Sequence, residues 1–158
     1  MRITLLDIVV GLAVLALLWL AVGPRRHGPA VRVLLASPTL TPGVVNPDVT
    51  QRNIRSTICV HGWTSIVRPP TAYTSTLKRQ QLRAYGLVGP SSGYQEDHLI
   101  SLELGGNPTD PRNLWPEPYP RAADVVKVEN QLNDEVCSGR LSLAHAQREE
   151  AMLKHEHG

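Results

Sequence analysis

The sequence lacks phenylalanine altogether, and tryptophan and tyrosine together make up only 4% of its 158 residues. A hydrophobic core must therefore be built mainly from valine, leucine, isoleucine and alanine. Hydrophobic residues still account for 42% of the chain, which excludes a wholly disordered protein and suits one compact domain with a leading segment. Because aromatic residues are so few, we expect Trp63 and Trp115 in the core of that domain.

Acidic residues are absent from 49–95, although the formal net charge of the chain is only +2. From Glu96 onward the acids outnumber lysine and arginine. A basic half beside an acidic half suits a protein that holds a phosphate backbone with one part and a metal ion with the other. Scattered arginines on a solvated helix face give the same pattern. The basic residues of the acid-free stretch are Arg52, Arg55, Arg68, Lys78, Arg79 and Arg83.

The only two cysteines, Cys59 and Cys137, lie far apart and form no Cys-x-x-Cys pair. This excludes a zinc ribbon, which needs four soft ligands in close pairs. The two residues are either one disulfide or two separate buried thiols. A disulfide closing so long a loop would stabilise the fold by about 4 kcal/mol, and the N-terminal segment makes it the favoured alternative.

Residues 1–23 form an apolar segment, interrupted between 3 and 23 only by Thr4 and Asp7. Such a segment is typical of a transmembrane anchor or of a signal peptide. Pro24 follows Gly23 directly and disfavours cleavage there, so we expect an uncleaved hydrophobic helix that attaches the chain to a membrane.

Two features of the sequence predict opposite sides of the membrane for the domain. Arg25 and Arg26 favour a cytoplasmic domain, whereas a disulfide favours an extracytoplasmic one. We expect a membrane-anchored or exported protein with an extracytoplasmic domain, and the cytoplasmic orientation stays open. Residues 24–48 carry prolines without any periodic pattern, which predicts an extended linker before a domain at 49–158.

Local patterns within 49–158 predict a mostly helical domain with a small two-stranded element in its middle. The clearest signal is the recurrence of Val125, Val128, Leu132 and Val136 at spacings of three and four, which gives a helix one apolar face. Ser142 is a candidate cap for a last helix. The expected elements are helices at 49–57, 75–85, 122–137 and 142–154, a strand at 94–100 and a turn at Gly105-Gly106.

The residues with the clearest chemical meaning follow Tyr94, where Asp97 and His98 precede a Gly-Gly turn and then Asn113. Hydrolysis of a phosphodiester needs a base that takes a proton from water, and the pKa of histidine suits that task. It also needs a hard cation, and carboxylate and amide oxygens suit Mg²⁺. Neighbouring residues of a strand point to opposite faces of the sheet. Asp97 and His98 can therefore serve one site only if the backbone bends there, or if the metal and the water lie on opposite sides of the strand.

The pattern Asp-His-Leu-Ile, Gly-Gly and Arg-Asn-Leu resembles the HNH, or ββα-metal, nuclease superfamily over 94–120. The resemblance implies an α+β fold in which a small, mostly helical domain surrounds a ββα hairpin–helix core. It implies that Asp97 binds a divalent metal, that His98 is the general base, and that Asn113 orients the base or binds the metal. The implied activity is metal-dependent endonuclease cleavage of nucleic acid, with DNA expected, and no protein partner is evident.

The chain departs from the superfamily at its third motif position, because residues 118–124 contain no histidine. This leaves open an inactive ββα module that binds nucleic acid or a partner. It also leaves open a structural protein whose metal at Asp97 and Asn113 only adds stability. Arg112, Arg121 and Lys127 are candidate phosphate contacts, and each is equally compatible with a solvated side chain. The candidates for a third metal ligand are Glu117, Asp124, Glu129 and Asn130.

Overall fold

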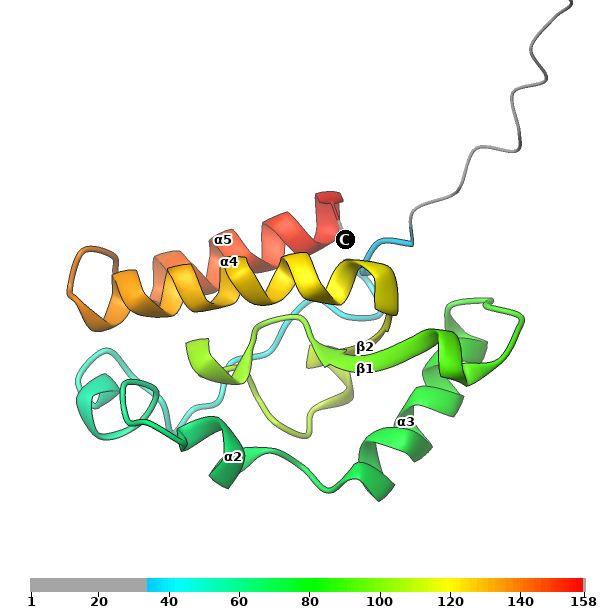
Figure 1. The fold of residues 1–158 in the computed structure, drawn as a ribbon, viewed down its shortest axis with the longest axis horizontal. Coiled ribbons are helices and arrows are strands. Elements are labelled where there is room, and N and C mark those ends of the chain that lie inside the picture. Colours follow the sequence, from blue (N-terminus) through cyan, green and yellow to red (C-terminus); the bar gives the residue numbers. More distant parts are fainter. Residues whose placement is uncertain (1–33, 158) are drawn as a thin grey trace, which may run out of the picture. The chain divides into compact units, whose positions relative to one another are not determined.

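A two-stranded antiparallel sheet lies at the centre of the domain, with helices on both sides of it (Figure 1). The structure is a computed structural model that describes residues 34–157, without the side chains of 120 and 122–124. Helices α4 and α5 pack side by side on one side of the hairpin, and α3 packs against both strands from the other. The elements are α2 (Trp63–Val67), α3 (Thr71–Ala84), β1 (Tyr94–His98), β2 (Leu114–Pro118), α4 (Tyr119–Cys137) and α5 (Leu143–His157).

The hairpin has a register that fixes which side chains share a face. Asp97 pairs with Trp115 and Gln95 with Glu117, so these four side chains lie on one face of the sheet. His98 pairs with Leu114 and belongs to the other face. Strand β2 continues directly into α4, which gives the order strand, strand, helix. The expected mixed domain with a short two-stranded element is therefore present.

The apolar periodicity of the last two helices places them against the core. In α4, Val125, Leu132 and Val136 are buried, whereas Val128 is 37% exposed and only partly fits the predicted face. Helix α5 begins after Ser142, whose hydroxyl accepts a hydrogen bond from the backbone N–H of His145 at 3.4 Å, as expected of a helix cap. The main core cluster comprises Val49, Ile54, Ile58, Ile100, Leu104, Leu132, Val136, Leu143 and Ala146.

Trp115 is fully buried and forms a second cluster with Ala36 and Leu99. Trp63 is partly buried against the main cluster. The expectation that these two rings serve the core is confirmed. Ring burial of this size carries much of the hydrophobic stabilisation in a domain without phenylalanine.

Residues 34–48 belong to the domain, so the predicted linker is wrong over this range. Ala36 is 1% exposed, and the buried Thr41 hydroxyl shares a 2.7 Å hydrogen bond with the hydroxyl of Tyr85. The carbonyl of Thr41 also lies 2.9 Å from the imidazole Nε2 of His155. Further backbone hydrogen bonds join this segment to the loop between the strands, so its polar groups are satisfied by other parts of the domain.

Two further expectations differ from the structure. The helix predicted at 49–57 is reduced to one 3₁₀ turn at Ile54–Ser56, and the loop predicted after it contains the short helix α2.

No helix within 34–157 is long and apolar enough to cross a membrane. The anchor predicted at 1–23 and the first part of the linker, 24–33, lie outside the described residues.

A disulfide joins Cys59, which follows the 3₁₀ turn, to Cys137 at the end of α4. It therefore fastens the segment that leads into α2 to the end of α4. A disulfide is compatible with an extracytoplasmic location and does not by itself establish one.

Reduction of this disulfide is expected to lower the free energy of unfolding by about 4 kcal/mol, because the reduced unfolded chain regains the freedom of a loop spanning 78 residues. Urea unfolding of the full-length chain with and without a phosphine reductant measures the change. A Cys59→Ser/Cys137→Ser variant should match the reduced protein in both buffers. A wild-type unfolding curve that the reductant leaves unchanged would contradict the prediction.

Candidate active site

His98 ends strand β1 and is only 4% exposed. Its imidazole Nε2 lies 3.1 Å from the carbonyl oxygen of Pro108. A carbonyl only accepts hydrogen bonds, so Nε2 must carry the proton in this contact. In the neutral ring, the remaining nitrogen Nδ1 then has a free lone pair. The contact with Pro108 thus selects the tautomer in which Nδ1 can accept a proton.

The surroundings of His98 lower the pKa of its imidazole below the usual value, chiefly because burial disfavours the charged ring. The contact with the Pro108 carbonyl and the charge of Asp97 oppose this change, while the charges of Arg68 and Lys154 add to it. The net lowering keeps His98 neutral at neutral pH. A neutral imidazole with one free nitrogen is the form that a general base needs.

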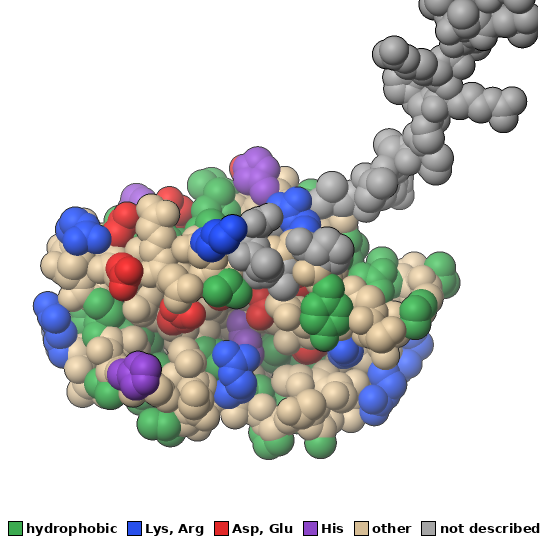
Figure 2. All heavy atoms as spheres, in the orientation of Figure 1, with side chains coloured by type: hydrophobic (Ala, Val, Ile, Leu, Met, Phe, Trp, Pro, Cys, Tyr) green, Lys and Arg blue, Asp and Glu red, His purple; other side chains and the backbone are tan. Residues whose placement is uncertain are grey.

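Asp97 and His98 line the same small cleft, although they come from opposite faces of the strand. The cleft has a volume of about 30 Å³, which is room for about two water molecules. Figure 2 shows one face of the molecule, with acidic and histidine side chains in its middle and lysine and arginine side chains around them. The lining residues are Thr64, Arg68, Asp97, His98, Ser101, Leu102, Glu103 and Glu129.

The side-chain amide of Asn113 is fully buried, and both its oxygen and its nitrogen form hydrogen bonds with backbone groups. Its Oδ1 accepts hydrogen bonds from the N–H groups of Ile100 at 3.0 Å and Val44 at 3.2 Å. Its Nδ2 donates to the carbonyls of Ile100 and Asn107, both at 3.0 Å. Direct metal binding by Asn113 does not fit these contacts, because the oxygen that a metal would need already holds two donors. The expectation of a metal ligand at Asn113 is therefore corrected to a role in orienting the loop.

The Gly-Gly turn exists because the loop passes too close to its neighbours for a side chain. Gly105 has a φ of 71°, in the left-handed region, and a Cβ there would press into Val49. A Cβ on Gly106 would overlap the carbonyl of Ile100 and come within 2.8 Å of the Asn113 amide nitrogen. The two glycines thus leave room for the Asn113 amide to reach the backbone of both Ile100 and Asn107. Through Asn107 this arrangement also holds Pro108, the partner of His98.

A buried lysine, Lys154 of α5, lies next to the cleft and is 3% exposed. Its ammonium nitrogen is 2.7 Å from Glu129 Oε1, 3.2 Å from Glu150 Oε1 and 3.5 Å from Asp97 Oδ2. Burial alone lowers the pKa of Lys154, but the three carboxylates overcome this effect and hold it well above its usual value. The lysine therefore stays charged inside the protein.

Two glutamates near this lysine have raised pKa values. Burial, followed by the charge of Asp97, raises the pKa of Glu117 to about 7. Burial also raises the pKa of Glu150 to about 7, against the attraction of Lys154. Burial is the main cause of both changes, because it disfavours the charged carboxylate, and the attraction of Lys154 offsets it only in part.

The four candidates for a third metal ligand lie in different places in the domain. Glu129 is buried and lines the cleft with Asp97 and His98. Glu117 is buried behind Asp97, with its Oε2 accepting a 2.9 Å hydrogen bond from Gln95. Asn130 is exposed on α4, and the side chain of Asp124 is outside the described residues.

The three predicted phosphate contacts do not line the cleft. Arg112 forms an ion pair with Asp110, with 2.6 Å between Nη2 and Oδ2. Arg121 lines a separate cavity between α4 and α5, and Lys127 lies on an exposed part of α4. Arg68, which follows α2, is the cation that the structure brings to the cleft instead.

Within 34–157, no three histidine, cysteine, aspartate or glutamate side chains lie close enough to enclose a metal ion. The donors at the cleft are nevertheless the hard carboxylate oxygens of Asp97, Glu103 and Glu129. Mg²⁺ keeps several of its waters and is commonly held by one or two carboxylates, so this donor set fits Mg²⁺. Asp97 and Glu129 are the two residues that would hold a Mg²⁺ ion.

Sequence reasoning missed Arg68 and Lys154 as members of the site. Arg68 had a signal, since it belongs to the acid-free basic stretch. Lys154 had a weaker one: Glu150 and Lys154 share the helix face of Leu143 and Ala146, at spacings of three and four. A charged pair on the buried face of a helix indicates an internal ion pair. The partners of that pair on β1 and α4 are too far away in sequence to be inferred.

Comparison with known proteins identifies no relative: the chain matches no protein-family model, no curated protein and no solved structure.

Replacement of Asn113 by alanine is expected to lower the free energy of unfolding by at least about 3 kcal/mol, because buried N–H and carbonyl groups lose their partners. Urea unfolding measures this loss, and Asn130→Ala on the exposed side of α4 should stay within about 0.5 kcal/mol of wild type. The loss should be equally large in EDTA and in Mg²⁺. A loss that appears only with Mg²⁺ would assign Asn113 to a metal.

Proposed function

We propose that the chain is a metal-dependent endonuclease of the HNH type, which hydrolyses phosphodiester bonds of nucleic acid. The observation that carries this proposal is the placement of His98, whose tautomer is selected by Pro108, in a water-sized cleft beside Asp97. The cleft is formed at the end of a β-hairpin that leads directly into a helix. This arrangement agrees with the expected ββα core.

In the proposed reaction, His98 takes a proton from a water molecule through Nδ1, and the water oxygen attacks the phosphorus. The bond from phosphorus to the 3′ oxygen breaks, and this oxygen takes a proton from solvent to leave as a hydroxyl. The neutral state of the imidazole at neutral pH makes this transfer possible without a prior deprotonation. Arg68 at the cleft contacts the oxygens of the phosphate that is cut. Asp97 and Glu129 would hold a Mg²⁺ ion, which would supply positive charge to the phosphate and to the departing oxygen when bound. The Asn113 amide keeps the loop of Pro108, and hence His98, in place.

The proposed substrate is DNA, held along the basic stretch that precedes β1. Arg79 and Arg83 are exposed on α3, and Arg52 and Arg55 are exposed near the N-terminal part of the domain. Contacts of this kind bind phosphates without reading sequence. We propose that the protein is membrane-anchored or exported and that this domain is extracytoplasmic, which agrees with the disulfide.

The second candidate function is an inactive ββα module that binds nucleic acid without cutting it. The observation that favours it is the Lys154 ammonium group, 3.5 Å from Asp97 Oδ2, which already places a positive charge at the proposed metal ligand. In this alternative the lysine replaces the metal altogether. Salt-sensitive DNA binding without cleavage in any divalent metal would support it over the enzyme.

The test of the proposed function is a plasmid-nicking assay with the full-length chain in Mg²⁺, Mn²⁺ and EDTA. Wild type should nick in the divalent metals and not in EDTA. His98→Ala should nick at least about 100-fold more slowly, because it removes the general base. His145→Ala is the matched control, since His145 is an exposed histidine of α5 outside the cleft, and it should nick at the wild-type rate.

Equal nicking by His98→Ala and wild type would contradict the mechanism, because an activity that does not need the imidazole comes from elsewhere. Unfolding curves of the three proteins, recorded in the same buffer, are needed to exclude a loss of folded protein. DNA binding by wild type without nicking in either metal would favour the inactive module.

A further inference from the structure

Lys154 is held by more contacts than a buried ion pair requires. Its ammonium nitrogen lies 2.6 Å from the backbone carbonyl oxygen of His98 and 2.7 Å from Glu129 Oε1. The carboxylates of Glu150 and Asp97 complete its surroundings at 3.2 and 3.5 Å. These partners come from β1, α4 and α5, so one side chain ties three elements together at the candidate active site.

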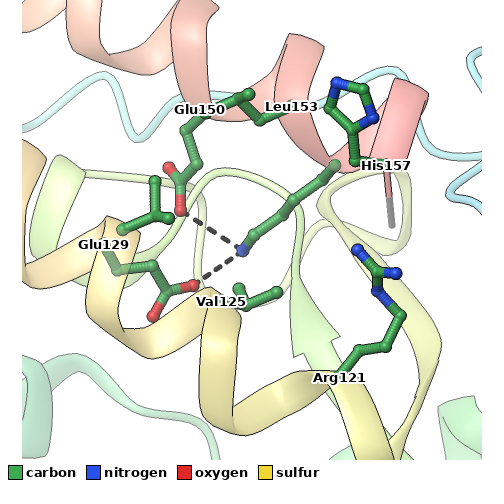
Figure 3. A pocket seen from close by; sticks show the side chains of 8 residues that line it. Arg121, Val125, Glu129, Glu150, Leu153 and His157 are labelled. Atoms are coloured by element: carbon green, nitrogen blue, oxygen red, sulfur yellow. Dashed lines mark hydrogen bonds and ion pairs between the residues drawn. The ribbon is translucent and has the colours of Figure 1, made fainter.

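The carboxylates that hold Lys154 are directed at its ammonium group. In Figure 3, Glu129 points inward from α4 and Glu150 from α5, and the dashed lines from both meet at the same nitrogen. The apolar side chains of Val125 and Leu153 line the same cavity, which has a volume of about 140 Å³. Lys154 lines this cavity as well, and its ammonium nitrogen reaches the backbone of β1 at the His98 carbonyl.

Glu150 adds a second grip on the same segment. While Oε1 of Glu150 faces Lys154, its Oε2 accepts a 2.9 Å hydrogen bond from the backbone N–H of Ser101. Together the two side chains of α5 contact the segment 97–101 at the Asp97 carboxylate, the His98 carbonyl and the Ser101 amide. Asp97, His98 and Ser101 all line the cleft.

Stability alone does not account for this arrangement. A buried lysine with its carboxylates costs desolvation energy, and apolar side chains of similar size usually stabilise a core at least as well. Hydrogen bonds to charged donors are, however, short and directional, so they fix the position of the groups they join. A fixed backbone at His98 is what an accurately placed base requires.

We propose that Lys154 is a positioning residue of the Asp97–His98 site, in which its ammonium group fixes the His98 carbonyl and the Asp97 carboxylate, while Glu129 and Glu150 hold the ammonium group. The C-terminal helix α5 is thereby a functional part of the site and not only a cover for the core. The effect on catalysis rests on the proposed function, whereas the contact with His98 does not.

The contact is tested first without any substrate, by the NMR signal of the His98 carbonyl carbon in ¹³C-labelled full-length protein. Lys154→Met should shift this signal, because the carbonyl loses a charged donor. Lys78→Met is the matched control: Lys78 donates at 2.8 Å to the carbonyl of Tyr94, at the other end of β1. It should shift the Tyr94 signal and leave that of His98 in place. An unchanged His98 signal in Lys154→Met would overturn the proposal.

Positioning is then separated from folding by a second variant. Lys154→Met leaves carboxylates without their cation, so its Tm should fall by about 10 °C. Lys154→Met/Glu150→Gln removes one of these charges and keeps an acceptor for the Ser101 N–H, so it should regain at least half of that loss. A double variant that melts no higher than Lys154→Met would contradict the charge argument.

Cleavage of labelled DNA decides the catalytic part. Both variants should show kcat reduced by at least about tenfold with KM within about twofold of wild type, because the base is displaced while DNA binding is not. If the double variant regains kcat together with Tm, Lys154 acts only through folding and the proposal is wrong. If wild type itself does not cut, the proposed function fails, and the carbonyl signal and the melting temperatures still decide whether Lys154 positions the segment.

Discussion

The side-chain amide of Asn113 is the constraint on which the centre of this domain depends. Its four hydrogen bonds to the backbone join the segment after β1, the loop before β2 and the N-terminal segment at Val44. These bonds join both ends of the chain between the strands, and the contact with Asn107 lies next to Pro108, whose carbonyl faces His98. The Gly-Gly turn is a consequence of this constraint, since only glycine allows the backbones to approach so closely.

Charge organises the second half of the site. The hairpin brings Asp97 and His98 to one cleft, but the positive charge beside them comes from two other parts of the chain, Arg68 after α2 and Lys154 in α5. Burial removes water from His98 and Lys154, so each depends on its neighbours for compensation. The candidate site is therefore a property of the whole domain, and the hairpin and α4 alone do not complete it.

The sequence predicted the parts of the fold that are decided locally. The apolar period of α4, the cap at Ser142 and the Gly-Gly turn each follow from neighbouring residues, and each agrees with the structure except at Val128, which is exposed. Residues 34–48 could not be predicted, because their contacts with Tyr85 and Asn113 join distant parts of the chain. The same holds for Lys154, whose partner on β1 is 56 residues away. Motif spacing placed Asn113 near His98 but gave no information on which atoms its amide would bind.

The most direct test of the account is the tautomer of His98, read from the ¹⁵N chemical shifts of its imidazole nitrogens at neutral pH. The account predicts a neutral ring with the proton on Nε2, where the Pro108 carbonyl accepts it, and an unprotonated Nδ1. A ring that carries its proton on Nδ1, or that is doubly protonated at neutral pH, would contradict the assignment of His98 as a base held ready by its loop.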